Sequence, residues 1–490
     1  MACTTLLVGK KASNDGSTII GRNDDGMFDP KKLIVIEPKD QPKVYKSKIG
    51  HLEIKLSENP LRYTATPNVD LTRGNWSACG INSENVAMTA TETITSNSRV
   101  LGADPYVRYE KKQTRRGKDK AGGIGEEDLV SIILPYIHSA REGVIRLGQL
   151  LEEYGTYEPN GMAFADENEI WWAETIGGHN FIAKRVKDDE YVINPNQFGI
   201  DNFDLKDAYG AQKEHICSKG IKDLIEKYHL DCNNDGKFNP RLVFGSHSDS
   251  DHVYNTPRAW FMARYFNPTT YKWDGPNADF TPESDNIPWS LKPERKIPVE
   301  EVKYILSSYY QGTKYNPYTS VDYPEKGMYR PIAVANTSEL GILQIRGYMP
   351  KEFRALEWIC FGCNAFNAAL PVYTNTDKMP DYLSKTTMTI RTDNFFWISE
   401  LMGVITDPHF GTSIQQIERY QSAMGANSYK LINEYDEKLA KAKQKEVPTL
   451  IREANSKLCD MARKTSDDAL SKVVRDAGMH MKVKYNRADN

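Results

Sequence analysis

The chain has 490 residues, a formal net charge of −3 at pH 7 and 26% charged residues. This near balance of acidic and basic residues argues against nucleic-acid binding as a main role, because nucleic-acid-binding proteins concentrate positive charge. No run of residues approaches the roughly eighteen consecutive apolar residues of a membrane-spanning helix. We therefore expect neither a nucleic acid nor a membrane as a partner.

The start of the chain and its cysteines indicate the compartment. The basic and apolar segments of a signal peptide are not visible in the first residues. The seven cysteines are an odd number spread thinly over a long chain, which is not the pattern of a disulfide framework. These features predict a cytoplasmic protein with reduced thiols.

The N-terminal segment predicts a β-hairpin that carries a cysteine and charged residues. Residues 3–8 and 17–22 are apolar or β-branched, and the polar run between them has the sequence of a tight turn. Such a hairpin brings Arg22 and Asp25 back beside Cys3. An arginine near a thiol lowers the thiol pKa and raises the fraction of reactive thiolate. The carboxylate can orient the arginine or an α-amine.

Strand and helix patterns then alternate to about residue 400. Pro135 predicts a kink or break in the first helix. Two segments, 102–125 and 267–298, are predicted to be long loops. Apolar spacing predicts strands over residues 32–37, 86–91, 162–165, 170–174, 180–185, 332–335, 341–345 and 355–360, and helices over 126–154, 206–228, 257–266 and 298–312.

The C-terminal part of the sequence is helical. Helical apolar spacing covers residues 395–405, 413–443 and 449–475. These helices can mediate oligomerisation, but we favour packing on the rest of the chain. The sequence thus predicts an α+β fold with a core over residues 1–400 and a helical extension over residues 401–490.

Cys3 is the candidate nucleophile. If Met1 and Ala2 are removed, its thiol and its own α-amine belong to one residue, a nucleophile with a built-in base. Ordinary pKa values of roughly 8.5 for the thiol and 8 for the amine make proton transfer between them nearly isoenergetic. A cysteine near a strand start is otherwise an ordinary apolar residue. The charged residues that follow favour the catalytic interpretation.

Four segments together resemble the cysteine-type N-terminal nucleophile (Ntn) hydrolases, which include penicillin V acylases, bile salt hydrolases and the related secernins. The resemblance is closer to the dipeptidases of lactic acid bacteria, of the dipeptidase A type. It implies a four-layer αββα sandwich with added C-terminal helices, and a homo-oligomer. The segments are Cys3 with Gly21-Arg22-Asn23-Asp24-Asp25, residues 80–93, Pro195-Asn196-Gln197-Phe198, and Tyr254-Asn255-Thr256-Pro257-Arg258.

The resemblance also implies roles for single residues. Cys3 would be the nucleophile, with Arg22 and Asp25 as its immediate partners. Asn196 would hold the substrate carbonyl or the tetrahedral intermediate, and Arg258 would stabilise the site electrostatically. The reaction would need neither a metal nor an organic cofactor.

Glu92 stands where the acylase branch has an oxyanion-hole asparagine. A carboxylate donates no hydrogen bond unless it is protonated, so the oxyanion hole would rely on backbone N–H groups and Asn196. Our hypothesis is that Glu92, with Thr91 and Asn82 nearby, binds the free α-ammonium group of a peptide. The alternative is that Glu92 pairs with one of the two arginines of the site.

The resemblance therefore implies a cysteine-type dipeptidase that acts on short peptides with a free N-terminus through a thioester. Self-cleavage or another peptidase would first remove Met1 and Ala2. One alternative is an N-acyl amide hydrolase of the penicillin V acylase or bile salt hydrolase type. The other is a non-enzymatic protein of the secernin type.

Three further motifs favour structural interpretations. Cys360 and Cys363 have redox or zinc spacing but no second pair, which indicates buried thiols. Residues 231–236 begin like a calcium loop, but Leu242 stands where such a loop needs Glu. Residues 247–252 are predicted to border the active site, with polar side chains that are solvated or cap a helix rather than bind a metal.

Overall fold

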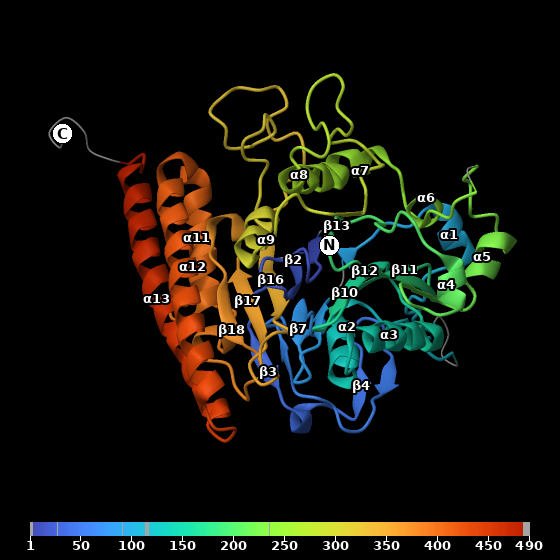
Figure 1. Cartoon of the computed structure of the whole chain (residues 1–490), viewed down its shortest axis with the longest axis horizontal. Coiled ribbons are helices and arrows are strands. Elements are labelled where there is room, and N and C mark those ends of the chain that lie inside the picture. Colours follow the sequence, from blue (N-terminus) through green and yellow to red (C-terminus); the bar gives the residue numbers. More distant parts are fainter. Residues whose placement is uncertain (1–2, 27, 91, 113–116, 235, 484–490) are drawn as a thin grey trace.

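The computed structural model confirms a mixed α+β protein (Figure 1). Two predicted features, Thr91 and the pair Met1 and Ala2, lie outside the described residues. The structure describes residues 3–26, 28–90, 92–112, 117–234 and 236–483.

Two antiparallel sheets form the centre of the molecule. The first has the strand order β15-β13-β1-β2-β16-β17-β18 and contains the predicted N-terminal hairpin. Its strands are β1 (Thr4–Val8), β2 (Thr18–Asp25), β13 (Tyr191–Asn194), β15 (Ser290–Leu291), β16 (Thr337–Ile345), β17 (Ala355–Phe361) and β18 (Leu370–Tyr373).

The second sheet has the strand order β14-β12-β11-β10-β8-β7, and β9 pairs with β10 beside it. Two small ribbons, β3 with β6 and β4 with β5, lie outside both sheets. The strands are β3 (Ile34–Ile36), β4 (Val44–Lys46), β5 (Glu53–Lys55), β6 (Tyr63–Ala65), β7 (Cys79–Ile81), β8 (Ala87–Thr89), β9 (Glu92–Thr93), β10 (Asn160–Ala165), β11 (Ile170–Ile176), β12 (Asn180–Val186) and β14 (His215–Cys217).

Apolar residues alternate between the two faces of each sheet, because successive side chains of a strand point in opposite directions. In β1, Leu7 packs in a core between the two sheets, whereas Leu6 and Val8 pack in a core on the outer face of the first sheet. In β11, Trp172 belongs to the core between the sheets and Trp171 to a core on the outer face of the second. Both faces of each sheet are therefore buried.

Helices cover the two outer faces (Figure 1). α2 and α3 contribute to the core outside the second sheet, and α8, α9 and α11–α13 to the core outside the first. The helices are α1 (Ser98–Ala103), α2 (Glu126–Ile133), α3 (Ala140–Tyr154), α4 (Leu205–Tyr209), α5 (Ile221–Lys227), α6 (Pro240–Phe244), α7 (Asp249–Tyr254), α8 (Thr256–Phe266), α9 (Val299–Leu306), α10 (Asp381–Ser384), α11 (Phe395–Thr406), α12 (Phe410–Lys441) and α13 (Val447–Met479), with 3₁₀-helices at Pro38–Asp40, Leu134–Tyr136, Asn364–Phe366 and Asp407–His409.

The predicted break at Pro135 is confirmed, because a 3₁₀ turn over Leu134–Tyr136 separates α2 from α3. The predicted helix over residues 206–228 is wrong, since β14 lies between α4 and α5. The Asp207 carboxylate accepts the backbone N–H groups of Lys213, Glu214 and His215 at 2.8–2.9 Å, which turns the chain into a strand. The polar side chain thus competes with helical hydrogen bonding.

The predicted strand over residues 332–335 is also wrong, and β16 begins at Thr337. The Ile332 carbonyl accepts side-chain hydrogen bonds from Arg330 at 3.1 Å and from Asn23 at 3.3 Å, so it is not available to a sheet. The helix predicted over residues 298–312 ends at Leu306.

The C-terminal helices α12 and α13 pair along one flank of the molecule, and α13 packs on β18 (Figure 1). A buried ion pair joins Arg346, just after β16, to Asp436 of α12, and Asp436 also accepts the Tyr373 hydroxyl at 2.8 Å. The predicted boundary between the core and the helical extension, at residue 400, lies inside α11. The division of the chain at this point remains a prediction. None of the helices within the described ranges combines the length and apolar character needed to cross a membrane.

We predict that Asp436→Asn lowers the free energy of unfolding by roughly 3 kcal/mol, because it leaves the Arg346 guanidinium buried without a counter-charge. Glu434→Gln is the matched control, since Glu434 forms an exposed pair with Lys438 one turn along the same helix. Chemical denaturation of both variants measures the difference. Equal stability of the two variants would show that the Arg346 pair does not fix α12 to the sheet.

Candidate active site

The hairpin places Cys3 and Arg22 on the face of the first sheet that looks toward the second. Thr5 of β1 lies opposite Arg22 of β2, and Cys3 and Thr5 point the same way because they are two residues apart. Arg22 Nη2 lies 2.9 Å from the Cys3 Sγ atom. Both side chains are buried, with Cys3 at 0% exposure. The predicted arginine–thiol contact is therefore present in the structure.

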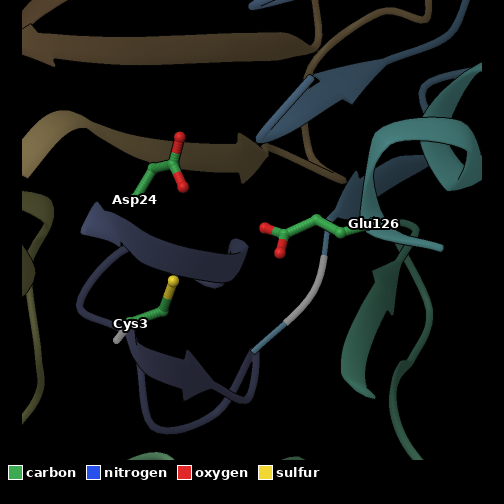
Figure 2. Close-up of side chains that lie close together, drawn as sticks. All are labelled: Cys3, Asp24 and Glu126. Atoms are coloured by element: carbon green, nitrogen blue, oxygen red, sulfur yellow. The ribbon is translucent and has the colours of Figure 1, made fainter. Parts of the chain in front are cut away.

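The Arg22 guanidinium also binds two carboxylates. Its Nη2 atom lies 3.3 Å from Asp24 Oδ1 and 2.7 Å from Glu126 Oε1. One oxygen of each carboxylate and the Cys3 Sγ atom lie within 4.8 Å of one another. Figure 2 shows these three side chains, which come from β2, from the first turn of α2 and from the residue before β1.

Sequence reasoning missed both Asp24 and Glu126. The period of two along β2 was the available signal for Asp24, since it places residues 22 and 24 on one face. Glu126 is distant in sequence, and only the packing of α2 brings it to Arg22. Lys31 binds the second oxygen of Asp24 at 2.7 Å. Burial raises the pKa of Asp24, but Lys31 and Arg22 outweigh burial and hold that pKa below its ordinary value.

The same three atoms have the donor types of a metal site, but their centre is already filled. Arg22 donates from one nitrogen to the thiol and to both carboxylates, so a metal ion there would have to displace a buried cation. The groups therefore fit a buried guanidinium better than a metal ion.

Arg258 and Asn196 hold the main chain of Cys3. The Asn196 Oδ1 atom accepts the Cys3 backbone N–H at 3.1 Å and an Arg258 Nη2 hydrogen at 2.8 Å. Arg258 Nη1 donates to the Cys3 carbonyl oxygen and, at 2.7 Å, to the Thr4 hydroxyl. Asn196 Nδ2 donates to the Thr93 carbonyl at 2.9 Å. The structure thus brings Cys3, Arg22, Asn196 and Arg258 together.

Asp25 points to the opposite face of β2 from Arg22. Its carboxylate accepts the Thr337 hydroxyl at 2.6 Å and pairs with Arg330 at 2.5 Å. Burial raises its pKa although Arg330 opposes the shift. The structure therefore gives Asp25 a contact with Arg330 rather than with Arg22 or the thiol.

The predicted substrate-binding residues differ in their surroundings. Glu92 Oε2 accepts the Thr5 hydroxyl at 2.7 Å, whereas Glu92 Oε1 is buried and has no hydrogen-bond partner in the described part of the chain. Asn82 donates to the carbonyls of Leu134 and Ile137 and accepts two backbone N–H groups, so its amide is fully used. Such an amide has no group left to bind a substrate.

Burial raises the pKa of the Cys3 thiol well above its ordinary value, although Arg22 opposes the shift. Glu92, Glu126 and Asp24 act in the same direction as burial. A protonated thiol is a weak nucleophile, so the site in this state needs a base to become reactive.

A cavity of about 240 Å³ adjoins the site. A larger cavity of about 610 Å³ lies between α9 and α12, and neither Cys3 nor its partners line it. Cys3 itself does not line the smaller cavity, but Asp24 and Glu126, which contact Arg22, do. The smaller cavity is lined by Asp24, Gly26, Asp29, Lys31, Asn68, Asp70, Arg73, Trp76, Thr93, Glu126, Glu158 and Ser338.

The segment over residues 247–252 leads directly into the site. Ser248 and Asp251 cap α7, and Asp251 accepts a hydrogen bond from Asn255, whose side-chain oxygen binds Arg258 at 2.7 Å. The interpretation of this segment as a helix cap is confirmed, and the cap is linked through Asn255 to Arg258 of the candidate site. Cys360 is a buried free thiol, as predicted, whereas Cys363 is a free thiol that is partly exposed.

We predict that Glu92→Gln changes the pH dependence of stability. Burial raises the pKa of Glu92 to about 7, while Arg258 opposes the shift. The native state therefore holds this proton more tightly than the unfolded chain. The resulting stability is complete below the ordinary pKa of about 4.3 and is lost as the pH rises through 7, an effect of about 3 kcal/mol.

The stability of Glu92→Gln relative to the parent protein should consequently increase between pH 5 and pH 8, as measured by denaturant unfolding. Glu152→Gln, which alters an exposed acid of α3, is the control. A stability difference that does not vary with pH would show that Glu92 titrates normally.

Comparison with known proteins agrees with this geometry. The chain is 53% identical over 447 residues to a protein named "Dipeptidase" from Bifidobacterium longum, covering 90% of this chain and 84% of that protein. It is 44% identical to "Probable dipeptidase A" of Streptococcus pyogenes over 100% of both chains, and 41% identical to "Dipeptidase A" of Lactobacillus helveticus over 99% of both. Residues 2–423 match Peptidase family C69, a family of cysteine peptidases. The chain belongs to this family and is a cysteine peptidase.

Proposed function

We infer that this protein is a dipeptidase that uses Cys3 as an N-terminal nucleophile after Met1 and Ala2 have been removed. The observation that carries the proposal is that two sets of contacts position Cys3. Arg22 contacts its thiol, and Asn196 and Arg258 bind its main chain. The names of its relatives support the substrate class.

The Cys3 backbone nitrogen would become the α-amine of the mature enzyme. Asn196 Oδ1 already accepts a hydrogen bond from this nitrogen at 3.1 Å, which fixes its position near the thiol of the same residue. The free amine accepts the thiol proton, and Arg22 stabilises the resulting thiolate. The amide of Asn196 thus orients the base.

The thiolate would then attack the scissile carbonyl carbon. The C–N bond breaks as the amine returns its proton to the leaving amino group, and a thioester to Cys3 remains. Water hydrolyses the thioester and releases the second product. Backbone N–H groups and Asn196 are the proposed oxyanion donors, and each such donor typically contributes about 3 kcal/mol to lowering the barrier.

Asp25 and Glu92 would support the residues that surround Cys3 rather than bind the substrate. The Arg330 pair of Asp25 joins β2 to the segment before β16. The charge of Arg258 acts on Glu92, which supports the alternative that Glu92 is a partner of the arginines. No contact supports a substrate role for Asn82.

The layers described above support a proposed Ntn-hydrolase sandwich, since helices cover both outer faces of a two-sheet core. The division into a core over residues 1–400 and an extension over 401–490 is part of this proposal. The homo-oligomer, self-processing and the cytoplasmic location remain predictions.

The walls of the 240 Å³ cavity favour a peptide with a free N-terminus over an N-acyl substrate. An acyl chain needs an apolar pocket, whereas most side chains that line this cavity are charged or polar. The intact thiol and its arginine contacts favour an enzyme over a non-enzymatic protein of the secernin type.

Cys3→Ala should abolish hydrolysis of free dipeptides and leave the thermal midpoint nearly unchanged, because it removes the nucleophile and only one small buried atom. The measurement pairs intact-mass analysis with a panel of free dipeptides and their N-acetyl forms.

A mature chain that begins at Cys3 and hydrolyses only the free dipeptides is the expected result. Retained activity in Cys3→Ala would overturn the proposal. Preference of the processed chain for N-acetyl substrates would assign it to the acylase branch instead.

A further inference from the structure

Two carboxylates lie closer to the candidate nucleophile than its chemistry requires. Asp24 and Glu126 each place an oxygen within 4.8 Å of the Cys3 Sγ atom. Negative charge at this distance opposes formation of a thiolate. An enzyme that needs a thiolate therefore keeps two groups that work against it, and this suggests that they have another partner.

The geometry of a dipeptide identifies that partner. In a reactive complex the attacked carbonyl carbon lies roughly 3–3.5 Å from the thiolate. The α-ammonium nitrogen is two bonds from that carbon, through bonds of about 1.5 Å, and so lies within about 6 Å of Sγ. Carboxylates close to Sγ, as Asp24 and Glu126 are, can therefore reach this ammonium group.

The adjoining cavity gives the ammonium a place and a third acceptor. Asp24 and Glu126 both line the cavity of about 240 Å³. Asn68 lines it too and is only 7% exposed, yet its Oδ1 atom has no hydrogen-bond partner among the described residues. A buried carbonyl oxygen is stable only when a donor reaches it. The Asn68 oxygen is therefore available to accept a hydrogen bond from a molecule in the cavity.

We propose that Asp24 and Glu126, together with the Asn68 carbonyl, form the subsite that binds the α-ammonium group of the substrate. This inference rests on the proposed dipeptidase function and names how the site selects free N-termini. Glu92, the residue first expected to do this, does not line the cavity and has one oxygen engaged by Thr5.

The test uses the processed enzyme, one free dipeptide that it hydrolyses, and the des-amino analogue in which hydrogen replaces the ammonium group. Glu126→Gln should lower kcat/KM for the free dipeptide roughly ten- to a hundredfold, the usual effect of losing a charged hydrogen bond. The Ki of the des-amino analogue as an inhibitor should change less than about threefold, because it makes no contact with the subsite.

The rate of Cys3 alkylation by neutral iodoacetamide separates this role from an effect on Arg22. It should not fall in Glu126→Gln, whereas a parallel loss of alkylation, dipeptide turnover and des-amino binding would overturn the proposal. Asn68→Ala removes the amide without changing a partner of Arg22, and it should lower kcat/KM for the free dipeptide roughly fivefold. This variant therefore tests the subsite even if Glu126→Gln folds poorly.

Asp70→Asn removes a negative charge from the exposed end of the same cavity and serves as the control for the general field. In Asp70→Asn, kcat/KM for the free dipeptide relative to Ki for the des-amino analogue should match the parent enzyme. Unchanged discrimination in Glu126→Gln, with Cys3-dependent hydrolysis intact in the parent, would refute the subsite alone. Absence of Cys3-dependent hydrolysis in the parent would instead refute the proposed function.

Discussion

The buried guanidinium of Arg22 is the interaction on which the site depends. A cation without water is stable only when anions or acceptors surround it, and Arg22 finds them on the thiol, on its own strand and on α2. Because Glu126 belongs to a helix that packs on the second sheet while Arg22 belongs to the first sheet, this contact joins the first sheet to the helices over the second. The position of the nucleophile is thereby coupled to the packing of the whole core.

The two arginines of the site divide their work between the side chain and the main chain of one residue. Arg22 contacts the Cys3 thiol, whereas Arg258 contacts the Cys3 carbonyl oxygen and orients Asn196 against the Cys3 nitrogen. The main chain of Cys3 is therefore fixed by groups that are independent of residues 1–2. Removing those residues would change the chemical state of the nitrogen while the contacts that position it remain.

Local patterns explain what the sequence could predict, and long-range packing explains what it could not. The hairpin and the contact of Arg22 with Cys3 follow from two apolar runs and a turn. The alternation along β2 was not applied to the acidic pair, although it places Asp24 beside Arg22 and directs Asp25 toward Arg330. From the sequence, Glu126 is recognisable only as the start of a helix. Its contact with Arg22 depends on where α2 packs. The mistaken helix at 206–228 has a related cause, since the Asp207 side chain takes backbone N–H groups that a helix would have used.

The two carboxylates beside Cys3 stabilise the buried guanidinium of Arg22, and the proposed subsite would give them a second role in binding the substrate. Burial raises the thiol pKa, and Glu126 and Asp24 act in the same direction, so these carboxylates favour the protonated and weakly nucleophilic thiol. A bound ammonium group would offset their charge and leave Arg22 to act on the thiol with less opposition. The same group that identifies a substrate with a free N-terminus would therefore promote formation of the thiolate that attacks it. Selectivity and activation would then arise from one electrostatic balance, which explains why the fold buries two carboxylates beside a cysteine that must lose its proton.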